Sequence, residues 1–139
     1  MVRIELLSWP DARPLAAPIR FAVFVDEQNV PAEIELDERD AACVHAVAFG
    51  ESGQPVGTGR LLPDGHVGRM AVMHAWRRQG VGGAILEALL SEARRRGHAE
   101  VVLSAQVQAV DFYCRHGFDA FGPVYEEAGI AHQDMRRRL

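Results

Sequence analysis

The residues best suited to chemistry in this chain lie in a loop that follows a short apolar segment. Val67–Met73 leads into the loop Arg77-Arg78-Gln79-Gly80-Val81-Gly82-Gly83, and an amphipathic stretch begins directly after it. Glycines just ahead of a helix leave backbone N–H groups unpaired at the positive end of the helix dipole, where they bind phosphate groups. The sequence therefore predicts a phosphate-binding turn built from main chain.

Two common phosphate loops do not fit this segment. A Walker loop requires a lysine followed by Ser or Thr, and the chain contains no lysine. A dinucleotide-binding fingerprint requires a third glycine, but Ile85 stands at that position after Gly80 and Gly82. The pattern that remains is Arg77-x-x-Gly80-x-Gly82.

This pattern resembles the pyrophosphate loop of the GNAT family of N-acetyltransferases, Gln/Arg-x-x-Gly-x-Gly/Ala. The preceding Gly68–Val72 resembles the usual lead-in of that family, and Asp111–Phe118 resembles its Phe-Tyr-x-x-x-Gly-Phe segment. Within the family, Phe24–Pro31 resembles the small ElaA/YjcF-like acetyltransferases, and it is also similar to acyl-homoserine-lactone synthases, which share the fold. The resemblance covers nearly the whole chain.

The resemblance implies an α+β fold of three layers, in which helices flank a mixed β-sheet that splays where Val67–Met73 and Val101–Ser104 part. It implies transfer of an acetyl group from acetyl-CoA to a primary amine by direct attack, with no metal. The acceptor, a small-molecule amine or a peptide, is not identified by the sequence. Two alternatives remain open: an acyltransferase of the same fold that uses a longer acyl-CoA, and a noncatalytic CoA-binding or interaction module.

The predicted CoA contacts come from the strand, the loop and the end of the next strand. Backbone N–H bonds to a charged acceptor contribute about 1.5–3 kcal/mol each, so about four of them would offset much of the roughly 4–15 kcal/mol cost of association. The open strand edge is expected to pair with the pantetheine amides. The predicted contact residues are Met70, Ala71, Val72, Arg77, Arg78, Gln79, Gly80, Val81, Gly82, Gly83 and Gln106. The alternative is that Gly80 and Gly82 only permit tight packing of strand and helix.

Two residues match catalytic positions of the family. The backbone N–H of Val72, at the family's strand bulge, is the candidate donor to the oxyanion of the tetrahedral intermediate. Tyr113 is the candidate general acid for the departing CoA thiolate. The alternative for Tyr113 is a packed aromatic side chain whose hydroxyl bonds to a backbone acceptor.

The group that deprotonates the acceptor is not specified by the sequence. Glu27, Glu33 and His45 are candidates, and they are also predicted, with His132, to contact the acceptor. The acidic segment Glu33–Asp40 alternates like a calcium loop but lacks the required glycine and closing glutamate. It is therefore interpreted as a solvated loop, and its carboxylates are expected to attract a cationic amine.

The elements that must position these groups follow from apolar spacing and turn residues. The segment Pro10–Asp26 is predicted to be helical, with Ala17, Phe21, Phe24 and Val25 on one side and with Pro14 and Pro18 breaking or kinking its beginning. A second helix, Val81–Arg96, should end at Gly97, and a short one, Ala109–Arg115, at Gly117. The predicted strands are Val2–Leu7, Cys43–Phe49, Val56–Leu62, His66–Met73, Val101–Ser104, Phe118–Phe121 and Ala131–Arg138. The resulting order is β-α-β-β-β-α-β-α-β-β.

Composition limits the class of protein. The 139 residues, 48% of them hydrophobic, are predicted to form one domain, and the net charge of −4 disfavours nucleic acid as a partner. No signal peptide or membrane span is evident, so a cytoplasmic location is expected. Cys43 and Cys114 are interpreted as free thiols. Many members of the family form dimers, so a homodimer is one expectation, although no interface is identified.

Overall fold

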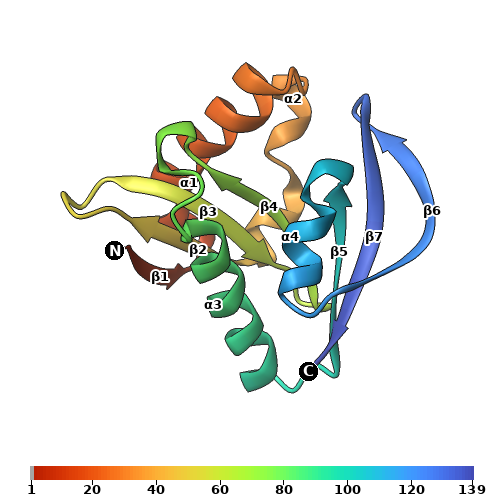
Figure 1. Cartoon of the computed structure of the whole chain (residues 1–139). Coiled ribbons are helices and arrows are strands. Elements are labelled where there is room, and N and C mark those ends of the chain that lie inside the picture. The colour runs from red at the N-terminus through yellow and green to blue at the C-terminus, as the bar shows by residue number, and fades with distance from the viewer. Residues whose placement is uncertain (1) are drawn as a thin grey trace.

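A seven-stranded mixed sheet forms the middle layer of the protein, whose computed structural model describes residues 2–139 (Figure 1). The strand order is β1-β2-β3-β4-β5-β7-β6, and only the central pair β4 and β5 is parallel. The strands are β1 (Arg3–Leu7), β2 (Val44–Phe49), β3 (Pro55–Leu61), β4 (His66–Val72), β5 (Glu100–Gln106), β6 (Asp119–Glu127) and β7 (Ile130–Arg138). The α-helices are α1 (Trp9–Arg20), α2 (Ala32–Glu35), α3 (Val81–Arg95) and α4 (Val110–Arg115). The remaining helical segments are the π-helix η1 (Phe21–Glu27) and the 3-10 turns η2 (Glu38–Ala42), η3 (His74–Trp76) and η4 (Val107–Ala109). The predicted α+β fold and element order are confirmed.

Strand β2 shows why the molecule has three layers. Its side chains alternate between two buried clusters: Ala46 and Ala48 pack with residues of α3, whereas Val47 and Phe49 pack with residues of α1. Successive side chains of a strand point to opposite faces, so α1 and α3 cover opposite faces of the sheet. None of the helices within residues 2–139 is long and apolar enough to cross a membrane.

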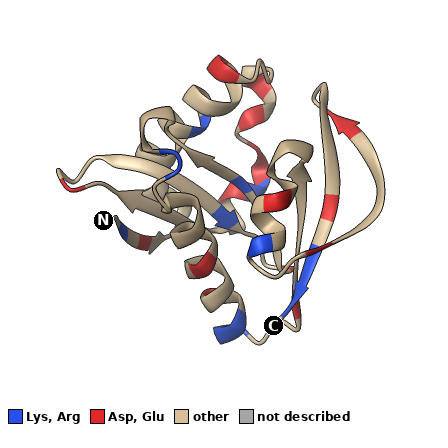
Figure 2. Ribbon diagram, in the orientation of Figure 1, with Lys and Arg blue, Asp and Glu red and all other residues tan. Residues whose placement is uncertain are grey.

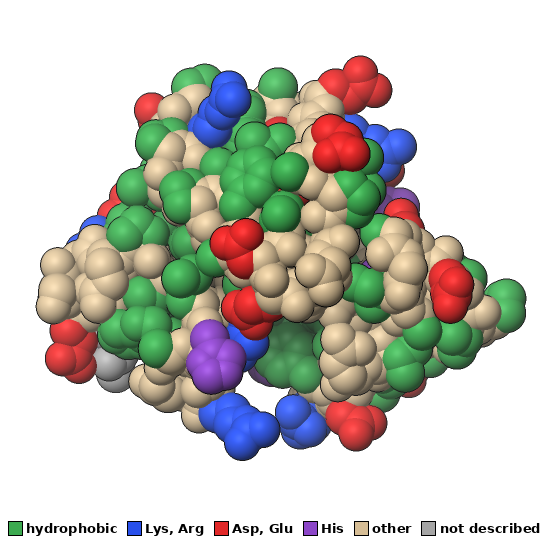
Figure 3. Space-filling model, turned by 90° about the horizontal axis from the view of Figure 1, so that it is seen from above, with side chains coloured by type: hydrophobic (Ala, Val, Ile, Leu, Met, Phe, Trp, Pro, Cys, Tyr) green, Lys and Arg blue, Asp and Glu red, His purple; other side chains and the backbone are tan. Residues whose placement is uncertain are grey.

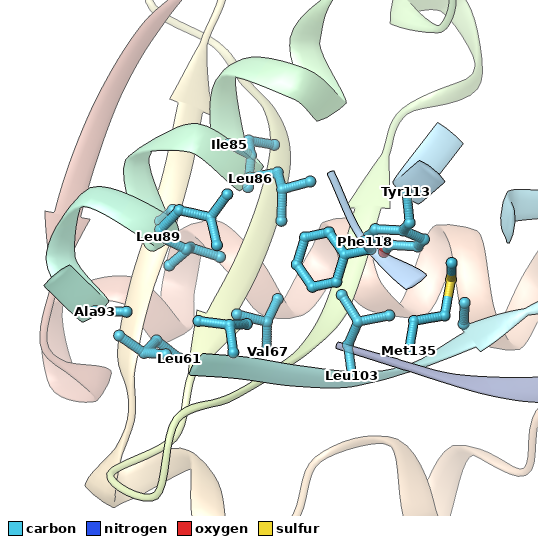
Figure 4. Close-up of a cluster of buried hydrophobic side chains, with 14 of the residues drawn as sticks. Leu61, Val67, Ile85, Leu86, Leu89, Ala93, Leu103, Tyr113, Phe118 and Met135 are labelled. Carbon is cyan, nitrogen blue, oxygen red and sulfur yellow. The ribbon is translucent and has the colours of Figure 1, made fainter. Parts of the chain in front are cut away.

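The apolar stripe of α3 supplies more of the main core than any other element, in agreement with the amphipathic spacing of its sequence. Its buried residues are Val81, Ile85, Leu86, Leu89, Leu90 and Ala93, whereas Glu87 and Arg94 on the other side are exposed. Tyr113 of α4 and Phe118, which directly precedes β6, pack into the same core (Figure 4). The helix ends before Gly97, which has the left-handed φ of +83° expected for its cap.

Strands β4 and β5 are paired over a very short distance. Only His66 with Val102 and Val67 with Leu103 are paired, and beyond them the two strands part. An extra residue also enters β4 between Gly68 and Ala71, where Arg69 adopts a left-handed φ of +50°. Such a bulge bends a strand and increases its twist. The predicted splay is confirmed.

The segment 10–26 is helical as predicted, but it is less regular than its spacing indicates. It is α-helical to Arg20, with Pro14 and Pro18 inside α1, and it continues as the π-helix η1. Of the four residues predicted to share one side, only Phe24 is buried, and the wider turn of the π-helix breaks the assumed 3.6-residue period from Phe21 onwards. Strand β6 is longer than predicted because Gly122 and Pro123 interrupt its ladder without ending the strand.

The acidic segment 33–40 is not the solvated loop that its composition suggests. It contains α2 and the start of η2, and the side chains of Glu35 and Asp40 are 3% and 0% exposed. Arg20 at the end of α1 binds both carboxylates, with Nε 2.8 Å from Glu35 Oε2 and Nη1 2.8 Å from Asp40 Oδ1. The prediction failed because the partners of these carboxylates lie far away in the sequence.

Two arginines of the sheet extend this buried cluster of charges. Arg60 on β3 donates to Asp37 and Asp40, at 2.8 Å in each case. Arg69 on β4 lies 3.3 Å from Glu35 and 3.4 Å from Asp37. Figure 2 shows acidic positions running down this segment towards arginine positions on the sheet. Burial acts to raise the pKa of Asp40, but the bonds from Arg20 and Arg60 hold it below its usual value.

We expect Asp40→Asn to lower the free energy of unfolding by about 3–5 kcal/mol, because it leaves two buried arginines without their shared counter-ion. Glu38→Gln, an exposed change in the same segment, should leave stability near that of the wild type. Denaturant unfolding of the three proteins at neutral pH measures the difference. A loss below about 1 kcal/mol for Asp40→Asn would contradict a structural role for the cluster.

Candidate active site

A cavity of about 280 Å³ lies where β4 and β5 part. Its walls come from four segments far apart in the sequence: η1 through α2, the strand β4, β5 with η4 and α4, and the turn between β6 and β7. Viewed from above, the molecule has a hollow with hydrophobic atoms at its floor and arginine and histidine side chains at its rim (Figure 3). Among residues 2–139, no group of three or more His, Cys, Asp or Glu side chains could hold a metal ion.

Tyr113 joins the core to this cavity. Its ring is 8% exposed and packs edge-on against Phe112 and Phe118, with centroids 5.0 and 5.8 Å away. Tyr113 also lines the cavity, and its hydroxyl has no hydrogen-bond partner within residues 2–139. Burial raises the pKa of Tyr113 to about 12. The alternative of a hydroxyl that bonds to a backbone acceptor therefore does not hold, and the group is free to donate to a ligand.

The glycine loop presents a row of unpaired amides. No backbone N–H from Arg78 to Gly83 has a partner among the described residues, and the first bond of the turn is from Ala84 N–H to the Gly80 carbonyl at 3.1 Å. Arg78 and Gly80 both have left-handed φ values, +64° and +82°, which turn the chain sharply into α3. The loop thus has the form of a main-chain anion cradle.

Packing alone does not require the two glycines of the pattern. A Cβ atom at Gly80 would meet nothing within 4 Å, and one at Gly82 would make an ordinary 3.5 Å contact with the ring of Phe112. Only the positive φ of Gly80 calls for glycine on backbone grounds. The space left above Gly82 is therefore available to a ligand.

The side chain of Arg77 does not extend towards a phosphate position. Its guanidinium holds Glu27 through two contacts of 2.8 and 2.9 Å, and its Nε donates to the Val72 carbonyl at 3.0 Å. Arg77 therefore links η1 to the end of β4. The predicted contact of its side chain with CoA would require this ion pair to open. Gln79 also bonds locally, to the Ala75 carbonyl at 3.2 Å.

The backbone of β4 beyond the bulge faces the open side of the sheet. Met73 N–H bonds to Val56 on β3 at 2.9 Å, and Val72 lies opposite Gly57. Because amides alternate along a strand, the Val72 N–H points away from β3 and towards the gap. The bulge itself lies at Arg69 and Met70 rather than at Val72, which corrects the predicted position by two to three residues.

Gln106 closes part of the gap through a partner that the sequence did not indicate. Its amide exchanges hydrogen bonds of 2.7 and 3.2 Å with Gln28, which follows η1. Gln108 donates to the same Gln106 oxygen at 2.6 Å. Both Gln28 and Gln106 line the cavity, so their amides form a bridge between its two sides.

Of the predicted acceptor residues, only His132 lines the cavity. Its Nδ1 lies 2.7 Å from the Ile130 carbonyl, which can only accept, so Nε2 is left with its lone pair.

The other three predicted acceptor residues lie elsewhere. Glu33 is exposed outside the cavity, and Glu27 is paired with Arg77. The prediction for His45 is wrong, because this residue is 1% exposed, lies outside the cavity and bonds to the Asp40 carbonyl at 2.9 Å. Burial lowers the pKa of His45.

Three charged residues that line the cavity were not among the predicted site residues. Glu35, Arg69 and Glu127 reach it from α2, β4 and the end of β6. A buried glutamate and an arginine with a positive φ leave no local sequence signal, because both features arise from the folded chain.

Comparison with known proteins places this geometry in a family. The model of the acetyltransferase (GNAT) domain matches residues 12–139. The chain belongs to the GNAT family. It is 41% identical to the uncharacterized N-acetyltransferase YjcF of Bacillus subtilis over 123 residues, which cover 86% of this chain and 87% of that protein. Structurally it is similar to Escherichia coli ElaA, with a TM-score of 0.87 and 28% identity, covering 99% of this chain and 100% of the other. It is also similar to an acyl-CoA N-acyltransferase from Pseudomonas aeruginosa, with a TM-score of 0.86, 32% identity and 99% coverage of both chains.

The loop geometry gives a test that separates folding from CoA binding in this GNAT protein. Gly82→Asp should fold normally, since Cβ fits there and an acidic residue suits the first turn of α3. Its carboxylate should repel the pyrophosphate and weaken CoA binding at least about tenfold. Gly82→Ala, which adds the Cβ without the charge, should bind CoA nearly as the wild type does. Calorimetric titration with CoA and thermal unfolding provide the two readouts, and wild-type affinity in Gly82→Asp would exclude this loop as the phosphate site.

Proposed function

We propose that this protein transfers an acetyl group from acetyl-CoA to a primary amine by direct attack. The observation that carries the proposal is the hydroxyl of Tyr113, which has no partner and borders a cavity between two parted strands. The hydroxyl oxygen is not fully enclosed, so it is accessible from the cavity and can donate to a ligand there. Membership of the GNAT family supports an acyl-CoA donor, as does the name of the related Pseudomonas acyltransferase.

The donor would lie along the gap from the glycine loop to Tyr113. The free amides of residues 78–83 would hold the pyrophosphate, and the open edge of Met70 to Val72 would pair with the pantetheine amides as an added strand does. No lysine is needed in this arrangement, because the main chain supplies the donors.

The reaction needs one bond formed and one broken. The amine nitrogen attacks the thioester carbonyl carbon, the Val72 N–H donates to the oxygen that becomes negative, and the carbon–sulfur bond then breaks. The ammonium must first lose a proton. Glu35, Glu127 and His132 are groups on the cavity wall that could take it, whereas Glu27, Glu33 and His45 lie elsewhere.

Tyr113 would serve the leaving group as a hydrogen-bond donor. With its pKa at about 12 it stays protonated throughout the neutral range. A thiol has a pKa of about 8.5, so complete transfer of the phenol proton to the thiolate is unfavourable. The phenol would therefore stabilise the departing thiolate mainly through the hydrogen bond itself.

The two alternatives predict different outcomes in one assay. A noncatalytic CoA-binding module would bind CoA but release no thiol with any amine. An enzyme that prefers longer chains would release thiol faster from a longer acyl-CoA than from acetyl-CoA. Thiol release from both donors, measured with a panel of primary amines, distinguishes these outcomes from the proposed activity.

Tyr113→Phe should lower kcat about tenfold to hundredfold while CoA affinity and stability stay unchanged, because its hydroxyl has no partner in the folded chain. The shape of the pH–rate profile between pH 6 and 10 should also stay unchanged, since a phenol with a pKa of about 12 does not titrate there. Steady-state kinetics and calorimetric titration test this.

The other tyrosine of the chain is the matched control. Tyr125 donates to Asp134 at 2.7 Å, so Tyr125→Phe should lower stability by about 1 kcal/mol, whereas Tyr113→Phe should not. Wild-type turnover in Tyr113→Phe would remove this residue from the mechanism.

A further inference from the structure

Glu35 offers the cavity a carboxylate oxygen that nothing in the protein uses. Its Oε2 is held by Arg20 at 2.8 Å and lies 3.3 Å from Arg69 Nε. Its Oε1 has no hydrogen-bond partner within residues 2–139. The residue as a whole is only 2% exposed, but it lines the cavity, so this oxygen is accessible from there. A cationic group that entered the cavity would find this oxygen available.

Arg69 offers the opposite charge next to it. Its Nε and Nη2 make four contacts with the α2 segment, all between 3.2 and 3.5 Å, and its Nη1 has no partner among the described residues. The bulge in β4 and the left-handed backbone of Arg69 are what bring this side chain to the cavity wall. An anionic group would therefore find a donor beside Glu35.

The charges of the two residues are not fully compensated by their neighbours. Burial raises the pKa of Glu35 despite its bonds to Arg20 and Arg69. Burial also lowers the pKa of Arg69 despite the nearby carboxylates. These directions are opposite to those of a well-compensated ion pair, so each side chain gains from a ligand of the opposite charge. A ligand that carries both charges on neighbouring atoms would satisfy both residues at once.

We propose that the acceptor is a free amino acid, whose ammonium group binds Glu35 Oε1 and whose carboxylate binds Arg69 Nη1. This inference rests on the proposed acetyl transfer and narrows its acceptor. The cavity that the pair lines is also lined by Phe24, Val30 and Ile34, so it suits an apolar amino-acid side chain. A peptide N-terminus or a simple alkylamine has the ammonium but lacks the adjacent carboxylate.

The test compares acceptors that differ only in the carboxylate. Leucine, leucinamide and isoamylamine are used with acetyl-CoA, and thiol release gives kcat/KM for each. The wild type should prefer leucine over isoamylamine by about tenfold to hundredfold, the value of a hydrogen-bonded charge, and should treat leucinamide like isoamylamine. Glycine with methylamine and phenylalanine with phenethylamine provide two further matched pairs.

Arg69→Gln should reduce the leucine preference to near unity, because it raises the KM for leucine more than the KM for isoamylamine. Arg39→Gln makes the same change of charge at an exposed arginine outside the cavity, and it should keep the wild-type preference. Glu35→Gln should weaken the use of both acceptors, whereas Glu38→Gln should not. If Arg69→Gln does not fold, the three matched pairs measured with the wild type decide the question.

Equal or better use of the simple amines by the wild type, or no thiol release with any amino acid, would overturn the amino-acid assignment. A leucine preference unchanged in folded Arg69→Gln would do the same. These results leave the proposed acetyl transfer standing if any amine is acetylated. Absence of thiol release with every amine, despite saturable CoA binding, would instead remove the proposed function.

Discussion

The parting of β4 and β5 is the constraint on which the rest of the structure depends. Two residue pairs join these strands, and beyond them the backbone groups of β4 face a cavity instead of a neighbouring strand. Unpaired backbone groups away from bulk water are costly, so the gap favours a ligand with amides of its own. The bulge at Arg69 and Met70 turns β4 as the strands separate, and it brings one charged side chain to the cavity wall. The gap thus creates both the donor channel and the place where the acceptor must meet it.

The buried cluster of charges explains how an irregular acidic segment can form a cavity wall. Removing charges from water costs free energy that offsets much of the attraction within buried ion pairs, so such pairs are weak evidence for stability by themselves. The directions of these bonds determine the position of the acidic segment. Arg20 and Arg60 hold residues 35–40 against the sheet through short, oriented hydrogen bonds. Asp40 is completely enclosed and accepts from both arginines, whereas Glu35 keeps one oxygen unbonded. The same cluster therefore contains a purely structural carboxylate and one that is available to a ligand.

The parts that could be predicted from the sequence are those set by neighbouring residues. The α3 stripe, its glycine cap and the loop of free amides follow from spacing over a few turns, and the splay followed from the family resemblance. The errors about the acidic segment and the acceptor residues concern interactions between distant residues. Arg20 and Arg60 bury carboxylates that a local pattern assigns to solvent, and the same packing encloses His45 away from the cavity. Arg77 has the family's position in the loop, but its partner Glu27 is 50 residues away.

The pairing of charges also changes how acceptor selection must be understood. A mouth lined by free carboxylates would attract any cation through its field, as the composition of residues 33–40 suggests. In the folded chain Arg77 pairs with Glu27 at the surface, and Arg20 and Arg69 lie against one oxygen of Glu35, so these carboxylates do not act as a set of free charges. Discrimination among amines then depends on a few unbonded atoms and their spacing. Selection by spacing favours a ligand with charges of both signs over one that is merely cationic, because only the former matches both members of a neighbouring pair.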